Sequence, residues 1–348
     1  MSVKTLGICG SGQLSMMLCQ AAKRHKIKTI VLTDDKDGPA KKYCDEFFYC
    51  NLNNKSKIEE FTNKIDVATL EFENFDFSIL EQIEKIKSFF PNPKINKIVQ
   101  DRILEKEFFR LLKIPVTNYA LIKKKEDIKK NSSLLPGILK STKGGYDGHF
   151  SYRINSISEI DSLNIDFSRI HILEKKVNFI KEISIIATRY QSGQISFFLP
   201  FENIHKDQIL NETKSPANIE DRTAKIAIEY SRKLLLKHNY IGTMAIEYFL
   251  DQDDNLLANE TASRVHNSGH ITINNYTSSQ FDQHIRAVCN LTFEEPKLIN
   301  KGKMINILGE EILKFRKKKF SNNEHFFDYG KKIIRPKRKM GHLNIIEL

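Results

Sequence analysis

The sequence predicts an α/β domain at the N-terminus, a larger α+β region in the middle and a small basic segment at the C-terminus. Up to about residue 95, apolar runs of strand length alternate with helical stretches, which is the pattern of a parallel, right-handed α/β sheet. Pro91-Asn-Pro93 then breaks the chain and indicates a domain boundary. Beyond this break strand-like runs dominate. The 348 residues are also too many for one hydrophobic core, so two or three subdomains are expected.

The N-terminal elements follow in a regular order. The imperfect fingerprint Gly10-x-Gly12-x-x-Ser15 lacks the third glycine and the acidic residue of a dinucleotide site, so it is weak evidence for NAD. A phosphate or another small ligand at the same helix N-terminus stays open. The expected elements are a strand at 4–9, a turn at Gly10-Ser-Gly12, a helix at Gln13–Lys23, a strand at Ile27–Leu32 and a strand at Asp66–Leu70.

After the break, a helical pattern runs from Ile95 to Leu112 and carries Asp101-Arg102 on a mainly polar stretch. Ile114-Pro-Val opens the α+β region. Helices are expected at Ile219–His238 and Gln280–Asn290, and the last part begins with the apolar run Met304–Leu308. The expected strands are Gly137–Lys140, Ile172–Val177, Glu182–Tyr190, Ile195–Pro200, Thr243–Leu250 and Leu256–Asn259.

Composition limits the classes of protein. Hydrophobic content of 40% and charged content of 28% are typical of a soluble globular protein, and no run of about 18 apolar residues predicts a membrane span. The five cysteines are an odd number without CxxC spacing, so we expect free thiols and a cytoplasmic location. The net charge of +12 could indicate nucleic acid, but the lysines lack interleaved aromatic residues, and a solvated surface explains them better. A nucleotide-binding regulatory protein or a nucleic-acid-binding protein remains the alternative from another class.

The segment Lys140-Ser-Thr-Lys-Gly-Gly-Tyr-Asp-Gly-His149 is suited to binding phosphates. Lys140 follows an apolar strand, and the glycines after it allow backbone N–H groups to approach phosphate oxygens closely. The alternative is a surface turn between two strands.

A carboxylate pair is predicted in the second half of the chain. Glu247 lies in an apolar strand, Glu260 ends another, and the turn residues 251–255 between them predict a hairpin. Neighbouring positions in the hairpin would bring both carboxylates to one hard cation. The alternative is one exposed and one salt-bridged glutamate. Glu260 is followed within ten residues by Arg264, His266 and His270. Guanidinium and imidazole groups beside a carboxylate pair suit an anionic substrate.

These motifs resemble those of a known family. Lys140–His149, Met244-Ala-Ile-Glu247, Asn259–His270 and Arg335-Pro-Lys-Arg-Lys-Met-Gly-His-Leu-Asn344 are similar to segments of the N5-carboxyaminoimidazole ribonucleotide synthases. Members of that family are also called the ATPase subunit of phosphoribosylaminoimidazole carboxylase. The family belongs to the ATP-grasp superfamily. The resemblance covers nearly the whole chain, and Arg-Val-His-Asn-Ser-Gly-His with the C-terminal motif is its most specific part.

The resemblance implies an ATP-grasp fold: a Rossmann-like domain at 1–95, a nucleotide-binding domain at 96–292 and a small C-terminal domain at 293–348. The implied activity is ATP-dependent carboxylation of 5-aminoimidazole ribonucleotide with bicarbonate, through carboxyphosphate, in purine biosynthesis. Another ATP-grasp ligase, such as the formate-dependent glycinamide ribonucleotide transformylase, is the alternative enzyme. The expected cofactors are ATP and Mg²⁺, with Mn²⁺ as a substitute. The expected partners are small molecules and a second copy in a homodimer, without nucleic acid or membrane.

The resemblance also assigns residues to roles. Glu247 and Glu260 would bind the metal, and Arg264, His266 and Asn267 would surround bicarbonate and carboxyphosphate. Tyr146, Asp147, His149, Lys331 and Arg338 would hold the ribonucleotide, with the last two on its phosphate. The residues expected to contact ATP are Arg102, Lys140, Gly145, Tyr146, Asp147, Gly148, His149, Phe150, Ser151, Glu174, Lys175, Lys176, Val177, Glu182, His205, Asn259 and Glu260.

One departure from the family generates a prediction. His149-Phe150 stands where the family usually has Arg-Gly, so a permanent charge near the ribonucleotide becomes a titratable one. A nearby phosphate favours the protonated imidazole and raises its pKa above about 6.5. Affinity for the ribonucleotide should therefore weaken as pH rises through the neutral range. His149→Arg should flatten this dependence and tighten binding at about pH 8. Parallel pH curves for the two proteins would exclude His149 from substrate recognition.

Overall fold

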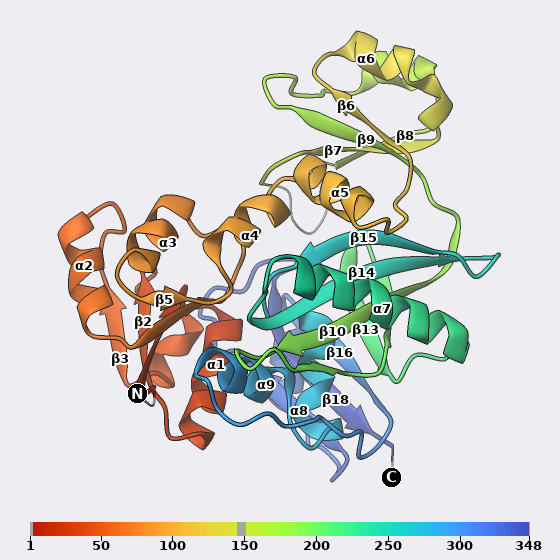
Figure 1. Ribbon diagram of the computed structural model, residues 1–348. Helices are drawn as coiled ribbons and strands as arrows, with labels where there is room; N and C mark the ends of the chain where they lie inside the picture. The colour runs from red at the N-terminus through yellow and green to blue at the C-terminus, as the bar shows by residue number, and fades with distance from the viewer. Residues whose placement is uncertain (1–2, 145–150, 348) are drawn as a thin grey trace.

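The computed structural model describes residues 3–144 and 151–347 (Figure 1). Its strands form a five-stranded, a four-stranded and a nine-stranded sheet within these residues. The α/β organisation at the N-terminus and the α+β organisation after it are therefore confirmed. No helix in the described part of the chain combines the length and apolar character needed to cross a membrane.

The N-terminal sheet is parallel, in the order β3-β2-β1-β4-β5, with α1, α2 and α3 in the connections. The predicted strands at 4–9, 27–32 and 66–70 and the predicted helix at 13–23 are confirmed as β1, β2, β4 and α1. The short edge strands β3 and β5 were not predicted. The elements are β1 (Thr5–Cys9), α1 (Gln13–Arg24), β2 (Lys28–Thr33), β3 (Glu46–Tyr49), α2 (Lys55–Asn63), β4 (Val67–Leu70), α3 (Phe77–Glu84) and β5 (Ser88–Phe89).

The helical pattern predicted at 95–112 is two helices rather than one, α4 (Pro93–Val99) and α5 (Arg102–Leu111). Asp101 causes the break, because its side chain accepts hydrogen bonds from the backbone N–H groups of Ile103, at 3.0 Å, and Leu104, at 3.4 Å. Such a residue begins a new helix. Arg102 is consequently the first residue of α5.

The four-stranded antiparallel sheet and α6 form a small unit that we call the lid, at the top of Figure 1. Its strand order is β6-β9-β7-β8, and Leu139, Ile154 and Leu173 fill its core. The strand predicted at 172–177 ends two residues early, so Val177 lies beyond it. The elements are β6 (Tyr119–Ile122), α6 (Lys125–Lys130), β7 (Gly137–Ser141), β8 (Ser151–Ile154) and β9 (His171–Lys175).

The nine-stranded antiparallel sheet connects the middle of the chain with its C-terminal part. The order is β15-β14-β10-β12-β13-β16-β18-β17, and β11 pairs with β10. The strands β12, β13, β17 and β18 were not predicted. They are β10 (Phe179–Arg189), β11 (Ile195–Phe197), β12 (Phe201–Lys206), β13 (Ile209–Ser215), β14 (Gly242–Asp251), β15 (Leu256–Ala262), β16 (Gly302–Leu308), β17 (Glu324–Asp328) and β18 (Lys339–Ile346).

Helices cover this sheet and join it to the N-terminal domain. α7 (Asp221–Lys237) packs on β10 and β14 around the core residues Leu234, Met244 and Ile246. α9 (Gln280–Val288) packs on the same two strands and also contacts α1 (Figure 1). The predicted helices at 219–238 and 280–290 are thus confirmed. The shorter helices are α8 (Thr272–Asn275) and α10 (Glu311–Phe315).

Candidate active site

The predicted residues converge on a cavity of about 510 Å³ between the lid, α5 and the large sheet. Its walls come from segments far apart in the sequence, including the first residue of β18, Lys339. The sequence-predicted residues that line it are Arg102, Lys140, Ser151, Glu182, His205, Glu247, Asn259, Glu260, Arg264, His266 and Asn267.

Other predicted residues lie elsewhere. Glu174 is buried behind Lys140, while Lys175, Lys176 and Val177 lie at or just after the end of β9. Lys331 and Arg338 do not line the cavity; their side chains donate to the carbonyls of Lys339 and Ile333 respectively, each at 2.7 Å. The predicted positions Gly145, Tyr146, Asp147, Gly148, His149 and Phe150 fall outside the described residues.

Glu247 and Glu260 form the electrostatic centre of the cavity. The predicted hairpin is confirmed as β14 and β15, and the two glutamates are direct partners across it. Burial, together with the Glu260 carboxylate, raises the pKa of Glu247. Two carboxylates held this close in a partly buried site favour a cation between them, and their oxygens are ligands that Mg²⁺ accepts. The residues present therefore fit a hard divalent cation.

Cationic and neutral donors approach this pair from two sides. A guanidinium nitrogen (Nη1) of Arg102 lies 3.4 Å from Oε2 of Glu260, and Nε2 of His266 lies 3.6 Å from Oε1 of Glu247. Nδ1 of His266 accepts the backbone N–H of Ser268 at 3.3 Å, which favours the tautomer with its proton on Nε2. Burial and Arg264 hold the pKa of His266 well below its usual range, so the ring is neutral and can direct an N–H into the cavity.

A largely buried ion-pair chain joins the lid strands β7 and β9 to α5. Lys140 donates to Oε2 of Glu174 at 2.6 Å, and Nζ of Lys106 lies 3.5 Å from Oε1 of the same carboxylate. Burial opposes ionisation of Glu174, yet Lys106 and Lys140 lower the pKa of its carboxyl to about 2. The carboxylate is therefore charged and fixes Lys140 at the cavity wall.

Arg264 is held in place from the N-terminal domain. Its guanidinium is engaged by both carboxylate oxygens of Glu73, with Nη2 to Oε1 at 3.0 Å, and Nη1 donates to the carbonyl of Val265 at 2.9 Å. A planar guanidinium held at two edges has a fixed orientation. Beside it, Nδ2 and Oδ1 of Asn267 are buried and have no hydrogen-bond partner within the described residues. The Asn267 amide is thus available to a ligand.

His205 and Glu182 form an ion pair on neighbouring strands of the large sheet. Burial opposes protonation of His205, but the contact with Glu182 raises its pKa overall. Both residues line the cavity, Glu182 from β10 and His205 from β12, a strand that was not predicted.

The N-terminal fingerprint is filled by the chain itself. Glu71 accepts the backbone N–H of Gly12 at 2.5 Å and that of Ser15 at 3.0 Å, at the start of α1. A Cβ on Gly10 would lie 2.6 Å from Cγ of Glu71, so the two groups are in close contact. The anion-binding N–H groups of this helix are taken by a carboxylate, which leaves the dinucleotide interpretation without its phosphate site.

Sequence reasoning missed four charged residues of this site: Glu73, Glu105, Lys106 and Lys339, of which all but Lys106 line the cavity. A sequence signal existed for two of them, because Lys339 lies within the C-terminal motif and Glu73 lies just after the predicted strand that became β4. Glu105 and Lys106 gave no such signal, because adjacent charges on a helix ordinarily indicate a solvated face. Chemically, the site offers cations for anionic groups, a carboxylate pair for a metal and neutral donors for a small acid.

Comparison with known families covers most of the chain. The ribonucleotide synthetase preATP-grasp domain matches residues 3–100, the ATP-grasp domain matches residues 107–281, and the phosphoribosylaminoimidazole carboxylase C-terminal domain matches residues 303–348. The predicted fold class is confirmed by these matches.

Individual relatives agree with the family matches. The N5-carboxyaminoimidazole ribonucleotide synthase of Bacillus subtilis is 34% identical over 98% of this chain and 91% of its own length. The crystal structure of an ADP complex of N5-carboxyaminoimidazole ribonucleotide synthetase has a TM-score of 0.94 and 36% identity, covering 99% of this chain and 92% of that one. The Aspergillus clavatus N5-carboxyaminoimidazole synthase in complex with ADP and 5-aminoimidazole ribonucleotide has a TM-score of 0.91 at 26% identity, covering 99% and 94%.

The ion pair of His205 and Glu182 generates a prediction about stability. A histidine whose pKa is raised by folding contributes stability below its unfolded pKa of about 6.5, and this contribution is lost as pH rises through the folded pKa. His205→Gln should therefore lower the free energy of unfolding more at about pH 6 than at about pH 9. Chemical denaturation of both proteins at the two pH values measures the difference, and an equal loss at both would contradict the ion pair.

Proposed function

Because the chain belongs to the N5-carboxyaminoimidazole ribonucleotide synthase family of ATP-grasp ligases, we propose that it carboxylates 5-aminoimidazole ribonucleotide with bicarbonate while converting ATP to ADP and phosphate. The observation that carries this proposal is the placement of Arg264, His266 and Asn267 in one cavity with the carboxylate pair. A rigid guanidinium, a neutral N–H donor and a free amide suit a small planar anion such as bicarbonate.

The nucleotide would lie between the lid and the large sheet. Arg102 and Lys140 supply positive charge for the phosphates, and Glu182 accepts hydrogen bonds from the ribose hydroxyls. We assign the adenine edge to Glu174, Lys175, Lys176 and Val177, through the backbone at the end of β9 and just after it. Gly145–Ser151 would close over the phosphates, and His205 would border the nucleotide.

Glu247 and Glu260, with Asn259 beside them, would hold Mg²⁺, which Mn²⁺ can replace. The ion would neutralise charge on the phosphate oxygens during transfer. Arg102 supports this arrangement by offsetting the charge of Glu260. His266 supports it from the other side, because its Nε2 faces Glu247 without adding a second positive charge.

Two bond exchanges complete the proposed reaction. An oxygen of bicarbonate, oriented by Arg264 and Asn267, attacks the γ-phosphorus, and the bond to the β-phosphate oxygen breaks to release ADP. The amine nitrogen of the ribonucleotide then attacks the carbon of carboxyphosphate, or CO₂ formed from it. Phosphate leaves with the electron pair of the broken C–O bond and takes up the proton that the amine loses. Exclusion of water protects the mixed anhydride.

The ribonucleotide would enter beside the C-terminal strands. We assign Lys331 and Arg338 to its phosphate and Tyr146, Asp147 and His149 to the rest of the molecule. We further propose a division of the chain into domains at 1–95, 96–292 and 293–348. The free thiols of all five cysteines suit a reducing compartment such as the cytoplasm, and a homodimer is the assembly we expect.

A coupled assay of ADP release tests the function. With ATP and bicarbonate present, ADP formation should rise strongly when the ribonucleotide is added, and formate should not replace bicarbonate. Formate-dependent turnover would instead favour a transformylase. Absence of nucleotide turnover together with RNA binding would favour the nucleic-acid alternative.

The metal assignment predicts the effect of Glu260→Gln. The amide keeps the shape of the side chain but loses the negative charge that a hard cation requires, so ATP turnover should fall by at least about 100-fold while the protein stays folded. Glu229→Gln, on the exposed surface of α7, is the matched control and should retain full activity. Near wild-type Mg²⁺-dependent turnover in Glu260→Gln would refute the assignment.

The phosphate assignment predicts the effect of Arg338→Ala. Loss of a charge-assisted hydrogen bond costs about 1.5–3 kcal/mol, so ribonucleotide affinity should fall about ten- to hundredfold. ATP affinity should change little, since the nucleotide lies between the lid and the large sheet. Calorimetry with each ligand measures the two effects separately, and equal losses would contradict the assignment.

A further inference from the structure

The strand that carries Glu260 contains an irregularity. Glu247 pairs with Glu260 across the hairpin, but the next residue, Tyr248, pairs with Ala258, so Asn259 has no partner on β14. Successive side chains of a regular strand point to opposite faces. Asn259 and Glu260 nevertheless both line the cavity. The β-bulge at Asn259 accounts for this, because an extra residue re-aims the side chains that follow it.

Two consecutive residues of α5 bind the backbone of this bulge. Nζ of Lys106 donates to the carbonyl of Asn259 at 2.8 Å and lies 3.4 Å from that of Ala258. Oε1 of Glu105 accepts the backbone N–H of Thr261 at 2.5 Å. The two side chains thus form hydrogen bonds with the backbone on both sides of Glu260, to the carbonyl of Asn259 and the N–H of Thr261. At this point the bulge interrupts the ladder of backbone hydrogen bonds between β14 and β15.

Both side chains are deeply buried. Glu105 is 3% exposed and Lys106 is 1% exposed. Burying an ammonium group is costly unless it is paired and hydrogen-bonded. Apolar residues at the same positions of α5 would pack against β15 without that cost. The polar character of both side chains is therefore explained by the backbone groups that they bind rather than by packing.

Lys106 also contacts the lid. Its Nζ lies 3.5 Å from Oε1 of Glu174 on β9, whose other oxygen accepts Lys140 at 2.6 Å. A continuous polar chain therefore runs from Lys140, through Glu174 and Lys106, to the backbone next to Glu260. This chain connects the group assigned to phosphate with the strand assigned to the metal.

We propose that Glu105 and Lys106 are positioning residues that hold the bulge at Asn259 and thereby fix Glu260 opposite Glu247 for cation binding. The proposal rests on the proposed function in that Glu247 and Glu260 are taken as the cation ligands. Neither positioning residue needs to touch the cation. Their effect should appear in the affinity for the metal–nucleotide complex rather than in the affinity for the ribonucleotide.

The test is the binding of Mn²⁺ in the presence of ADP, followed by electron paramagnetic resonance. Lys106→Met keeps the length of the side chain and removes its charge and its donors. Mn²⁺ affinity should weaken about tenfold, the effect expected from losing one hydrogen bond to a charged group. Ribonucleotide affinity, measured by calorimetry without nucleotide, should remain within about twofold of the wild type.

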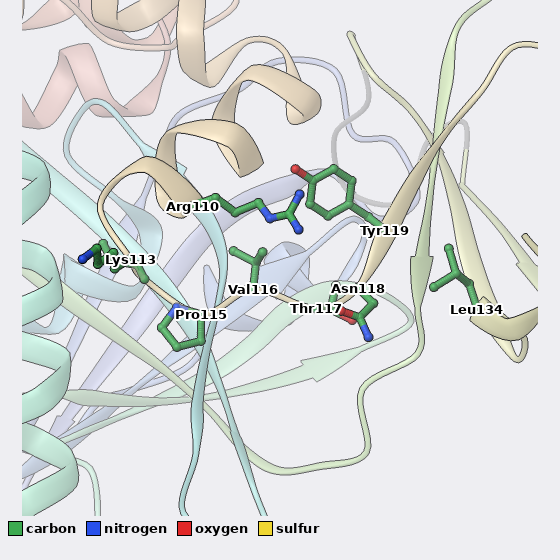
Figure 2. Close-up of a pocket in the computed structure, with 9 residues that line it drawn as sticks. Arg110, Lys113, Pro115, Val116, Thr117, Asn118, Tyr119 and Leu134 are labelled. Carbon is green, nitrogen blue, oxygen red and sulfur yellow. The ribbon is translucent and has the colours of Figure 1, made fainter.

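Arg110→Met is the matched control on the same helix. Arg110 is 63% exposed, lies with its guanidinium 5.3 Å from the centre of the Tyr119 ring, and lines a separate cavity of about 540 Å³ beside the linker 113–118 (Figure 2). Removing this charge should leave Mn²⁺ affinity unchanged. A loss equal to that of Lys106→Met would show a general effect of charge on α5 and would overturn the proposal.

A second variant keeps the proposal testable if Lys106→Met does not fold. Glu105→Met removes the acceptor for Thr261 N–H and should also weaken Mn²⁺ binding about tenfold, whereas Glu105→Gln keeps an acceptor oxygen and should bind normally. Unchanged Mn²⁺ affinity in the folded variants, parallel losses for Mn²⁺ and ribonucleotide, or failure of both Met variants to fold would each overturn the positioning role. A wild-type protein that binds Mn²⁺ and ADP but shows no ribonucleotide-dependent turnover would refute the proposed function alone.

Discussion

The constraint on which the active site depends is the placement of two carboxylates opposite each other in a partly buried cavity. Glu247 and Glu260 repel each other, and burial alone already raises the pKa of Glu247. The surrounding groups reduce the repulsion between the two carboxylates. Arg102 lies against Glu260 and offsets its charge, and the neutral ring of His266 faces Glu247. A divalent cation would offset the remaining negative charge of the two carboxylates. The same cation would also offset the negative charge of the nucleotide phosphates.

Parts of the chain that are distant in sequence hold the functional groups in place. Glu73, in the segment that follows β4 of the N-terminal sheet, orients Arg264. The C-terminal motif divides its residues between two tasks. Lys339 reaches the cavity, whereas the side-chain amide of Asn344 donates to the carbonyl of His270 at 3.0 Å and so ties β18 to the segment after Asn267. The C-terminal strands therefore support the proposed bicarbonate site directly, and α9 links the same region to the N-terminal domain through α1.

Local patterns in the sequence predicted much of this. The parallel N-terminal sheet, the hairpin of β14 and β15 and the helices α7 and α9 follow from strand and helix periodicity and from turn residues. The missed strands β12 and β13 carry polar residues such as Asn203, Glu212 and Lys214 whose pairing is set by neighbours in the sheet. The break at Asp101 was missed because the apolar pattern runs through it, although the aspartate is a good helix-capping residue.

The site was predicted less completely than the fold, for a physical reason. Motifs identify groups that meet a ligand, because that chemistry requires particular residue types at fixed spacing. Glu105 and Lys106 instead meet the backbone of β15, some 150 residues away, and in sequence they look like a solvated pair. The bulge that they bind is itself invisible in the sequence, since it depends on the register of two strands.

The most direct test of the account is to follow oxygen-18 from labelled bicarbonate during turnover with the ribonucleotide. If a bicarbonate oxygen attacks the γ-phosphorus within this cavity, one labelled oxygen should appear in each inorganic phosphate released. Mass spectrometry of the phosphate gives the answer. Phosphate without the label, released together with carboxylated ribonucleotide, would contradict the formation of carboxyphosphate and with it the role assigned to Arg264, His266 and Asn267.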